Sequence, residues 1–221
     1  MKTVLSTKIL TPSQKELFLN SGLGLVQYNA LKIEFLDVKI PLRCKNYIFT
    51  SKNAVKGFLQ RAEGSDYSDC QTFCVGEKTK RFLEENGLKV TKVADNSSDL
   101  AQFIVKHHQK EEFLFVCGNL RREELPQILS ENNVQYKEVE AYRTHLNTKR
   151  FNREFDGILF FSPSGVRSYI QDNQIDGESI FCIGETTAAE AAKHSKQIIV
   201  AHRPTVENVL VQAINHFKNK V

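Results

Sequence analysis

The stretch FCIGETTAAEAAKHS, residues 181–195, repeats a pattern already present in FCVGEKTKRFLEENG, residues 73–87. Each stretch contains a short apolar run, then Gly-Glu, and then a threonine three residues after the glycine. An apolar run that ends at glycine and leads into a helix-forming segment is typical of a buried strand followed by a helix. The sequence therefore predicts the same strand-to-helix unit twice.

The repeat extends to both sides of this stretch. Ser51 aligns with Ser162 at an offset of 111 residues, and Gly76 aligns with Gly184 at an offset of 108. A difference of three residues in one loop reconciles the two offsets, and each copy is predicted to run strand, helix, strand, helix, strand. The segments are NYIFTS (46–51), KNAVKGFLQRAE (52–63), TFCVG (72–76) and LKVTKV (88–93) in the first copy, and FDGILFFS (155–162), PSGVRSYIQDN (163–173), SIFCIG (179–184) and KQIIVA (196–201) in the second.

This alternation predicts an α/β protein with two parallel-sheet lobes, because strands that alternate with helices form parallel sheets covered by those helices. The opening segment also indicates strand, helix, strand, but it is too short to bury both faces of a sheet alone. We therefore expect it to dock on the C-terminal copy, which gives a discontinuous lobe of residues 1–31 and 146–221. Residues 41–136 form the inserted lobe, and residues 32–40 and 137–145 are predicted extended connections that act as a hinge.

The composition is that of a globular protein with no sign of a nucleic-acid partner, and it leaves an anionic small molecule open as a ligand. The net charge is +4, and no block of Lys or Arg marks a nucleic-acid interface. The five cysteines have no C-x-x-C spacing, so we expect buried free thiols. The N-terminus lacks the apolar core of a signal peptide and no apolar run is long enough to span a bilayer, so we expect a cytoplasmic protein without membrane contact.

Motifs for the common cofactors and metals are missing from the sequence. It contains no G-x-x-x-x-G-K-[ST], no G-x-G-x-x-G, no H-E-x-x-H and no G-x-S-x-G. The six histidines are scattered or adjacent on a polar segment, which does not favour metal ligation. We therefore expect neither a cofactor nor a metal ion.

Small polar residues follow the predicted strands of both copies. Thr50, Ser51 and Asn53 occupy the first turn, and Ser162 and Ser164 occupy its copy. The stretches from Gly76 to Thr79 and from Gly184 to Thr187 form the second pair. Helix N-termini at the carboxyl ends of parallel strands attract anions, but Ser, Thr and Asn also cap helices without any ligand. Pattern alone leaves these two interpretations about even.

An ordered set of motifs resembles the uroporphyrinogen-III synthase family. The resemblance covers the chain from about residue 45 onward and is weakest in the first forty residues. The set comprises IFTSKNAV (48–55), VGEKT (75–79), CGNLRREELP (117–126), VEAYRT (139–144), FFSPSGV (160–166), IGETTAAEA (183–191) and RPTVENVLVQAI (203–214).

This resemblance implies two flavodoxin-like α/β lobes, one of them discontinuous, that are joined by a two-stranded β connection and have the active site in the cleft between them. It also implies a substrate, the linear tetrapyrrole polycarboxylate hydroxymethylbilane. The family closes this substrate to uroporphyrinogen III with inversion of the last ring and loss of water, through an azafulvene and a spirocyclic intermediate, and needs no cofactor. We expect a monomer whose other contact is a transient one with the deaminase that supplies the substrate.

The resemblance also implies roles for individual residues. Tyr142 matches a family tyrosine that helps the hydroxyl group leave, because a phenol is protonated at neutral pH and can donate a hydrogen bond. Without the resemblance, the sequence favours Tyr142 as a β-strand tyrosine in a connecting strand without a catalytic role. Arg122 matches a basic position that meets a substrate carboxylate, but as an exposed arginine at a helix start it is equally solvated or paired with Glu123 or Glu124. The residues implied to bind substrate at the strand-to-helix turns are Thr50, Ser51, Asn53, Thr79, Ser162, Ser164, Thr186 and Thr187.

One departure from the family and two other interpretations stay open at this point. Many relatives have Ser-Pro at the first turn, whereas this chain has Ser51-Lys52, which adds a positive charge there. A two-lobed module that binds a small anion without chemistry would also explain the repeated turns. A catalytically silent member of the synthase family would explain them equally.

Overall fold

The computed structural model describes residues 1–41, 44–61, 67 and 69–218. The chain forms two compact units. Unit 1 combines Met1–Lys32 with His145–Val221, and unit 2 consists of Ile33–Thr144. The architecture confirms the predicted fold class of parallel-sheet α/β lobes, one of which is discontinuous.

Unit 1 is built on a five-stranded sheet in the order β11-β10-β9-β1-β2, in which every pair of neighbours is parallel. The N-terminal strand β1 lies in the interior of this sheet, where Leu5 is opposite Val26 on one side and Ile158 on the other. The opening segment therefore completes the C-terminal sheet. The strands are β1 (Thr3–Ser6), β2 (Gly24–Gln27), β9 (Gly157–Phe160), β10 (Ser179–Cys182) and β11 (Ile198–Val200).

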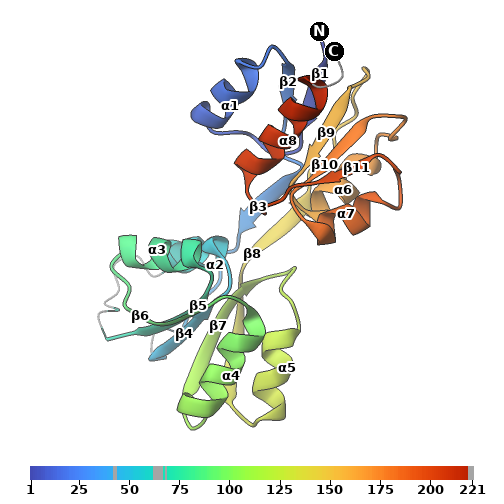
Figure 1. Ribbon diagram of the computed structural model, residues 1–221. Coiled ribbons are helices and arrows are strands. Elements are labelled where there is room, and N and C mark those ends of the chain that lie inside the picture. Colours follow the sequence, from blue (N-terminus) through green and yellow to red (C-terminus); the bar gives the residue numbers. More distant parts are fainter. Residues whose placement is uncertain (42–43, 62–66, 68, 219–221) are drawn as a thin grey trace. The chain divides into compact units, whose positions relative to one another are not determined.

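Helices cover both faces of the unit 1 sheet (Figure 1). Its central strands β9 and β10 are buried at every position, which is why they read as continuous apolar runs rather than alternating ones. Val4 and Phe181 pack under one pair of helices, and Leu5 and Ile180 pack under the other. The two pairs are α1 (Pro12–Leu19) with α8 (Val206–Lys218), and α6 (Pro163–Ile170) with α7 (Glu185–Ala191).

Unit 2 contains a six-stranded sheet in the order β3-β8-β7-β4-β5-β6. Most residues of the predicted connections 32–40 and 137–145 belong to this unit, where β3 and β8 are neighbours in the sheet. The strands are β3 (Leu31–Phe35), β4 (Asn46–Phe49), β5 (Gln71–Val75), β6 (Val90–Ala94), β7 (Glu112–Gly118) and β8 (Gln135–Leu146). The helices are α2 (Lys52–Arg61) and α3 (Glu77–Glu85) on one face, and α4 (Ser97–His108) and α5 (Glu124–Glu131) on the other.

Helix α4 is an element that the sequence analysis did not assign. It begins after β6 with Asn96 as its N-cap, whose side chain accepts a hydrogen bond from the Asp99 backbone N–H. Leu100, Ala101 and Ile104 form its buried face. The spacing i, i+1, i+4 places these three residues on one side of a helix, so the element follows the usual amphipathic pattern.

The two units share one strand order, but their chain order differs. In unit 2, β4, β5 and β6 run in sequence toward one edge, and α4 then leads directly into β7 on the other side of β4. In unit 1, β9, β10 and β11 do the same, and α8 follows, but the equivalent of β7 is β1 at the start of the chain. Unit 1 is therefore a circularly permuted version of the arrangement in unit 2.

Candidate active site

A pocket of about 380 Å³ lies at the carboxyl ends of the unit 2 strands. It is bordered by the turns after β4, β6 and β7 and by β8. Four of the residues predicted for the site line it, namely Thr50, Ser51, Arg122 and Tyr142. Open α/β sheets bind their ligands at the carboxyl ends of the strands, so this pocket is the candidate active site within unit 2.

Ser51 and Tyr142 are in direct contact in this pocket. The Ser51 Oγ and the Tyr142 hydroxyl oxygen are 3.0 Å apart, although the residues are 91 positions apart in the chain. The backbone N–H of Ala54 also donates to Ser51 Oγ at 3.1 Å, so Ser51 caps helix α2 as well. The two hydroxyl groups carry two protons and share one hydrogen bond, which leaves one O–H donor for a ligand.

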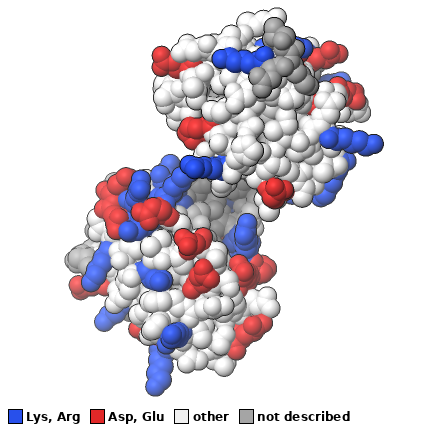
Figure 2. Space-filling view, viewed as in Figure 1, with Lys and Arg blue, Asp and Glu red and all other residues white. Residues whose placement is uncertain are grey.

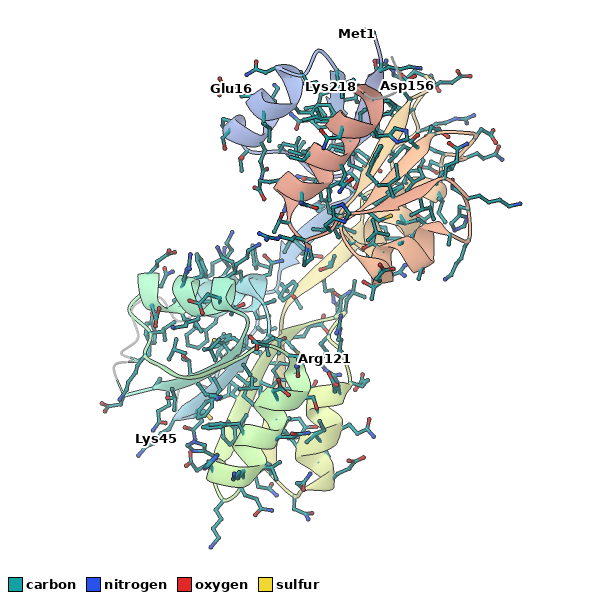
Figure 3. All side chains as sticks on the ribbon, viewed as in Figure 1. Met1, Glu16, Lys45, Arg121, Asp156 and Lys218 are labelled. Carbon is teal, nitrogen blue, oxygen red and sulfur yellow. The ribbon has the colours of Figure 1, made fainter. Side chains whose placement is uncertain are left out.

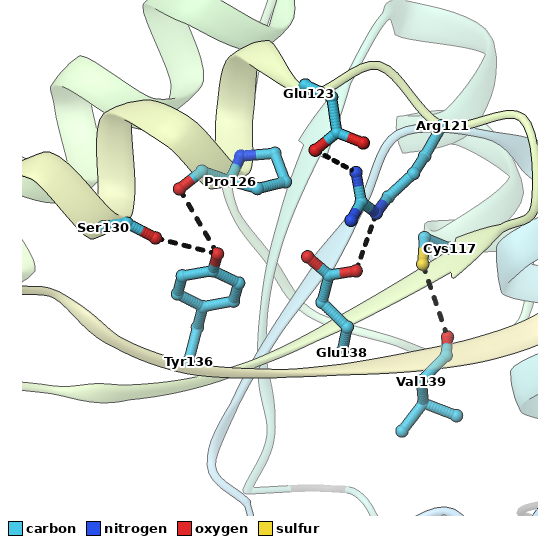
Figure 4. Close-up of polar contacts among 8 residues, drawn as sticks. All are labelled: Cys117, Arg121, Glu123, Pro126, Ser130, Tyr136, Glu138 and Val139. Carbon is cyan, nitrogen blue, oxygen red and sulfur yellow. Dashed lines mark hydrogen bonds and ion pairs between the residues drawn. The ribbon is translucent and has the colours of Figure 1, made fainter.

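The two adjacent arginines of the pocket have different surroundings. Arg121 makes ion pairs through Nη1 with Glu123 at 2.7 Å and through Nε with Glu138 at 2.6 Å (Figure 4). These two carboxylates raise the pKa of its guanidinium further, against the opposing effect of burial. Arg122 is exposed, and no ion pair among the described residues involves it. Of the alternatives left open for Arg122, pairing with Glu123 or Glu124 is not seen among the described residues, and its side chain is exposed to solvent.

The turn after β6 supplies polar residues that the sequence analysis missed. Asp95, Asn96 and Ser97 line the pocket beside the first turn of α4. Helices α2 and α4 thus both begin at the pocket, and their first backbone N–H groups carry partial positive charge. The signal in the sequence was the same as at Ser51, a strand that ends in small polar residues before an amphipathic segment. It was overlooked because α4 itself was not assigned.

Apolar side chains form another part of the pocket. Val75 and Leu125 contribute from β5 and α5, and Phe115 contributes from β7. Leu120 follows β7 and lines the pocket with a side chain that is 57% exposed. The pocket thus combines an apolar wall with one exposed arginine, the Asp95 carboxylate and several neutral hydroxyls.

Other residues predicted for unit 2 lie outside the pocket lining. Asn53 is half-buried in the first turn of α2, and Thr79 is buried in α3 with its backbone N–H bonded to the Gly76 carbonyl at 3.0 Å. The Nζ of Lys52 lies 4.6 Å from the centre of the Phe82 ring on α3. The extra positive charge at the first turn is therefore held against that ring.

The predicted residues of unit 1 occupy the equivalent turns after β9 and β10. Ser162 caps α6, where its Oγ accepts from the Gly165 N–H at 3.0 Å, and Ser164 Oγ accepts from Arg167 Nη2 at 3.0 Å. Thr186 is exposed, whereas Thr187 is 1% exposed. Ser162 and Ser164 therefore have protein partners already. The side chain of Thr186 faces solvent at the start of α7.

A larger pocket of about 790 Å³ lies in unit 1, but its position does not fit the site. Arg150, Arg153, Asp172 and Glu178 are among its lining residues. They belong to the loops before β9 and β10, at the amino ends of the strands. Ligands of open α/β sheets bind at the opposite edge, and none of the predicted residues lines this pocket.

The electrostatics of the described residues limit the chemistry that side chains can perform. Burial raises the pKa of the thiols of Cys74 and Cys117 to about 11 and that of Cys182 to about 12, so these thiols stay protonated at neutral pH and are poor nucleophiles. No cluster of His, Cys, Asp and Glu in the described part of the chain could hold a metal ion. Acidic and basic side chains are interspersed on the face of unit 2 seen in Figure 2.

Comparison with known proteins identifies the family. Residues 15–210 match the family model described as uroporphyrinogen-III synthase HemD. The chain belongs to the uroporphyrinogen-III synthase family. This confirms the resemblance found in the ordered motifs, and it extends the match toward the N-terminus.

Individual members of the uroporphyrinogen-III synthase family match this chain at low identity. The porphyrin biosynthesis protein HemD of Ruminiclostridium josui is 25% identical over 95% of this chain. The match covers only 48% of that relative's length. The uroporphyrinogen-III synthase of Chlorobaculum parvum is 25% identical, with 87% of this chain and 89% of that protein covered. The crystal structure of uroporphyrinogen-III synthetase from Helicobacter pylori has a TM-score of 0.76 at 18% identity, over 98% of this chain and all of that one, and supports the fold.

The described helices of this family member do not have membrane-spanning character. Within the described residues, none has the length and the apolar composition that crossing a bilayer requires.

Proposed function

We propose that this chain catalyses the cyclisation of hydroxymethylbilane to uroporphyrinogen III, with inversion of the last ring and release of water. The observation that carries the proposal is the meeting of Tyr142, Ser51 and Arg122 in one pocket of a chain that belongs to this family. Because the chain spans about half the length of one relative it matches, the activity is proposed for this chain rather than transferred from that protein.

The Tyr142 phenol is proposed to assist the departure of the substrate hydroxyl. The pair of hydroxyls at 3.0 Å has one O–H to donate, and a donor at the leaving oxygen stabilises the negative charge that develops there. The pyrrole nitrogen lone pair supplies the electrons that break the C–O bond, and the oxygen leaves as water with a proton from the hydroxyl pair. Loss of the pyrrole N–H proton then gives the neutral azafulvene and returns a proton to the hydroxyl pair. Attack by the substituted carbon of the last ring, fragmentation and renewed closure give the inverted ring.

Substrate carboxylates are proposed to bind the cationic and N–H-rich parts of the pocket. Arg122 offers an unpaired guanidinium, and the first turns of α2 and α4 offer backbone N–H groups. In unit 1, the turns that contain Ser162, Ser164, Thr186 and Thr187 are proposed to bind further carboxylates, and Asn53 and Thr79 are proposed to act near the turns of unit 2. Fixing both ends of a flexible chain lowers the barrier to ring closure, by up to about 7–11 kcal/mol in the best intramolecular cases.

Further proposals concern the partner, the oligomeric state and the location of the enzyme. Hydroxymethylbilane closes unaided to the uninverted isomer I, so the enzyme must receive it soon after the preceding deaminase releases it. We therefore propose a transient contact with that deaminase. Independently of the substrate, we propose a monomeric enzyme and a cytoplasmic location.

An isomer assay tests the proposal. The purified protein is supplied with hydroxymethylbilane generated in place by the deaminase, and the oxidised products are separated into porphyrin isomers I and III. We expect isomer III to predominate with the protein and isomer I to predominate without it. Isomer I alone from folded protein would contradict the proposal, and saturable binding of hydroxymethylbilane in that case would favour a binding module or a silent family member.

A substitution of Tyr142 tests the assigned role. Tyr142→Phe removes the hydroxyl but keeps the ring, so kcat for isomer III should fall by about tenfold, the factor for loss of one hydrogen bond of about 1.4 kcal/mol. KM should change little, because the phenol is proposed to act on the leaving group. Unchanged kcat in the folded variant would leave Tyr142 as a structural residue of β8.

A further inference from the structure

The ring of Tyr142 lies directly against the backbone of β7 at Gly118. A Cβ atom added to Gly118 would lie 2.6 Å from the ring atom Cε2 and 2.7 Å from Cε1, and it would also overlap Cζ. Carbon atoms in contact are normally about 3.5–4.0 Å apart. Any residue other than glycine at position 118 would therefore displace the ring of Tyr142.

A β-bulge in β8 turns Tyr142 toward this position. Strands β7 and β8 pair in register from Glu112 with Gln135 to Cys117 with Glu140, but Gly118 is opposite Tyr142, so Ala141 is the additional residue. Successive residues of a strand normally point to opposite faces. Ala141 and Tyr142 nevertheless pack on the same hydrophobic core beneath α2 and α3, as expected where a bulge redirects a side chain.

A second close contact, between α2 and β8, positions the helix whose cap residue Ser51 is hydrogen-bonded to the Tyr142 phenol. A Cβ added to Gly57 of α2 would lie 2.8 Å from the Ala141 carbonyl oxygen and 2.9 Å from the Ala141 Cβ. Glycine at position 57 therefore allows α2 to approach β8 at the bulge itself. Ser51 caps this same helix, and its Oγ reaches the Tyr142 hydroxyl at 3.0 Å.

We propose that Gly118 is a positioning residue for the reaction, because it leaves the space in which the bulge at Ala141 holds the Tyr142 phenol against Ser51. The role of Gly118 in turnover rests on the proposed function, whereas the position of the ring does not. Gly118 touches the ring and acts on the substrate only through Tyr142. The bulge determines the face of the sheet from which the Tyr142 side chain projects. Gly118 determines how closely the ring approaches β7, and Ser51 holds the hydroxyl through their hydrogen bond.

The kinetic test combines Gly118→Ala with Tyr142→Phe. Gly118→Ala should lower kcat for isomer III to about the level of Tyr142→Phe with KM changed less than about twofold, because the displaced hydroxyl is lost to the reaction. The double variant should be no slower than either single variant. If Gly118→Ala lowered kcat by the same factor in the wild-type protein and in Tyr142→Phe, the proposal would be overturned, because Gly118 would then act independently of the phenol.

A matched control separates positioning from general destabilisation. Gly157 is another buried strand glycine, where an added Cβ would lie 3.0 Å from ring atoms of Phe181 and Phe217 in unit 1. Gly157→Ala should lower the melting temperature without lowering kcat per folded molecule. If Gly118→Ala does not fold, Gly118→Ala combined with Tyr142→Ala should fold, because the overlapping ring is gone. Failure of both to fold would overturn the proposed contact.

A spectroscopic readout does not depend on activity. With ¹³C-labelled tyrosine the six tyrosines give a small set of ring signals, and the signal that Tyr142→Phe removes belongs to Tyr142. Gly118→Ala should shift this signal, and Gly157→Ala should not. An unmoved signal in folded Gly118→Ala overturns the proposal. A moved signal together with a wild-type protein that forms only isomer I would remove the proposed function while supporting the position of the ring.

Discussion

Arg121 and Arg122 are neighbours in the chain but have different surroundings. Arg121 is enclosed by Glu123 and Glu138, and it lies at the end of β7 (Figure 3). Arg122 is exposed at the same pocket. A guanidinium that is already paired with two carboxylates has little attraction left for a third, so the two residues should contribute to different properties.

Substitution of each arginine distinguishes these contributions. Arg122→Gln should raise KM for the polycarboxylate substrate by about tenfold, the factor for about 1.4 kcal/mol, with little change in stability. Arg121→Gln should lower the urea midpoint, because it leaves Glu123 and Glu138 facing each other without the cation. Steady-state kinetics and urea unfolding of both variants provide the check. A KM increase confined to Arg121→Gln would reverse the assignment.

Burial of the thiols makes a second prediction at this scale. Cys70 is 7% exposed and Cys117 is 4% exposed, whereas Cys44 is half-buried, although burial raises its pKa as well. We expect Cys44 to react first with an aromatic disulfide reagent at about pH 8, and the other four thiols to react only as the protein unfolds. Mass spectrometry of the labelled peptides at successive times measures the order. Rapid labelling of Cys182 in native protein would contradict it.

At the scale of elements, one carboxylate attaches the first strand of unit 1 to its neighbour. Asp156, which precedes β9, accepts hydrogen bonds from Lys2 Nζ at 2.7 Å and from the Thr3 backbone N–H at 2.7 Å. Burial would raise the pKa of Asp156, but these donors outweigh it and hold the pKa below its ordinary value. The contact joins residues more than 150 positions apart in the sequence, and it adds to the backbone pairing of β1 with β9.

The lowered pKa predicts an acid-dependent loss of stability. A carboxyl group with a lower pKa in the folded state stabilises the fold above its unfolded pKa of about 3.9, and this contribution is lost as the pH falls through the folded pKa. Asp156→Asn should therefore be less stable than wild type at about pH 6, and the difference should shrink near pH 3. Denaturant midpoints across this range measure the effect. Asp37→Asn is the matched control, because Asp37 is 91% exposed in its pair with Arg61 and should change little at either pH.

At the scale of the whole molecule, the two units differ in whether one continuous segment of the chain can form the sheet. Unit 2 is continuous, and its sheet is complete within residues 31–146. Unit 1 needs both termini of the chain, because β1 separates β9 from β2 in the middle of its sheet. Met1 and Lys218 lie at the same end of unit 1 (Figure 3), so the order of its elements could be made continuous by joining them.

A permuted fragment tests this dependence. Residues 145–218 joined through a short Gly/Ser linker to residues 1–32 should fold alone, because α8 then precedes β1 just as α4 precedes β7 in unit 2. Residues 145–218 without the N-terminal segment should not fold cooperatively, since β9 would lose its neighbour β1 and the core under α8 would be open. Circular dichroism melts and two-dimensional NMR spectra of both fragments give the answer. Cooperative unfolding of the unjoined fragment would show that β1 is dispensable.

The amino-acid sequence by itself determined the repeat, the class of fold and the turns at Ser51 and Ser162. These depend on local properties, namely apolar runs of strand length and small polar residues that cap the next helix. Helix α4 was not predicted from the sequence, and the polar turn from Asp95 to Ser97 before it was not predicted either. Only the tertiary structure decided which residues meet in the pocket of unit 2, because a parallel sheet brings the ends of strands far apart in the chain to one edge. It alone also decided that Tyr142 faces Ser51, since a bulge of one residue reverses the face of a side chain and leaves no local pattern in the sequence.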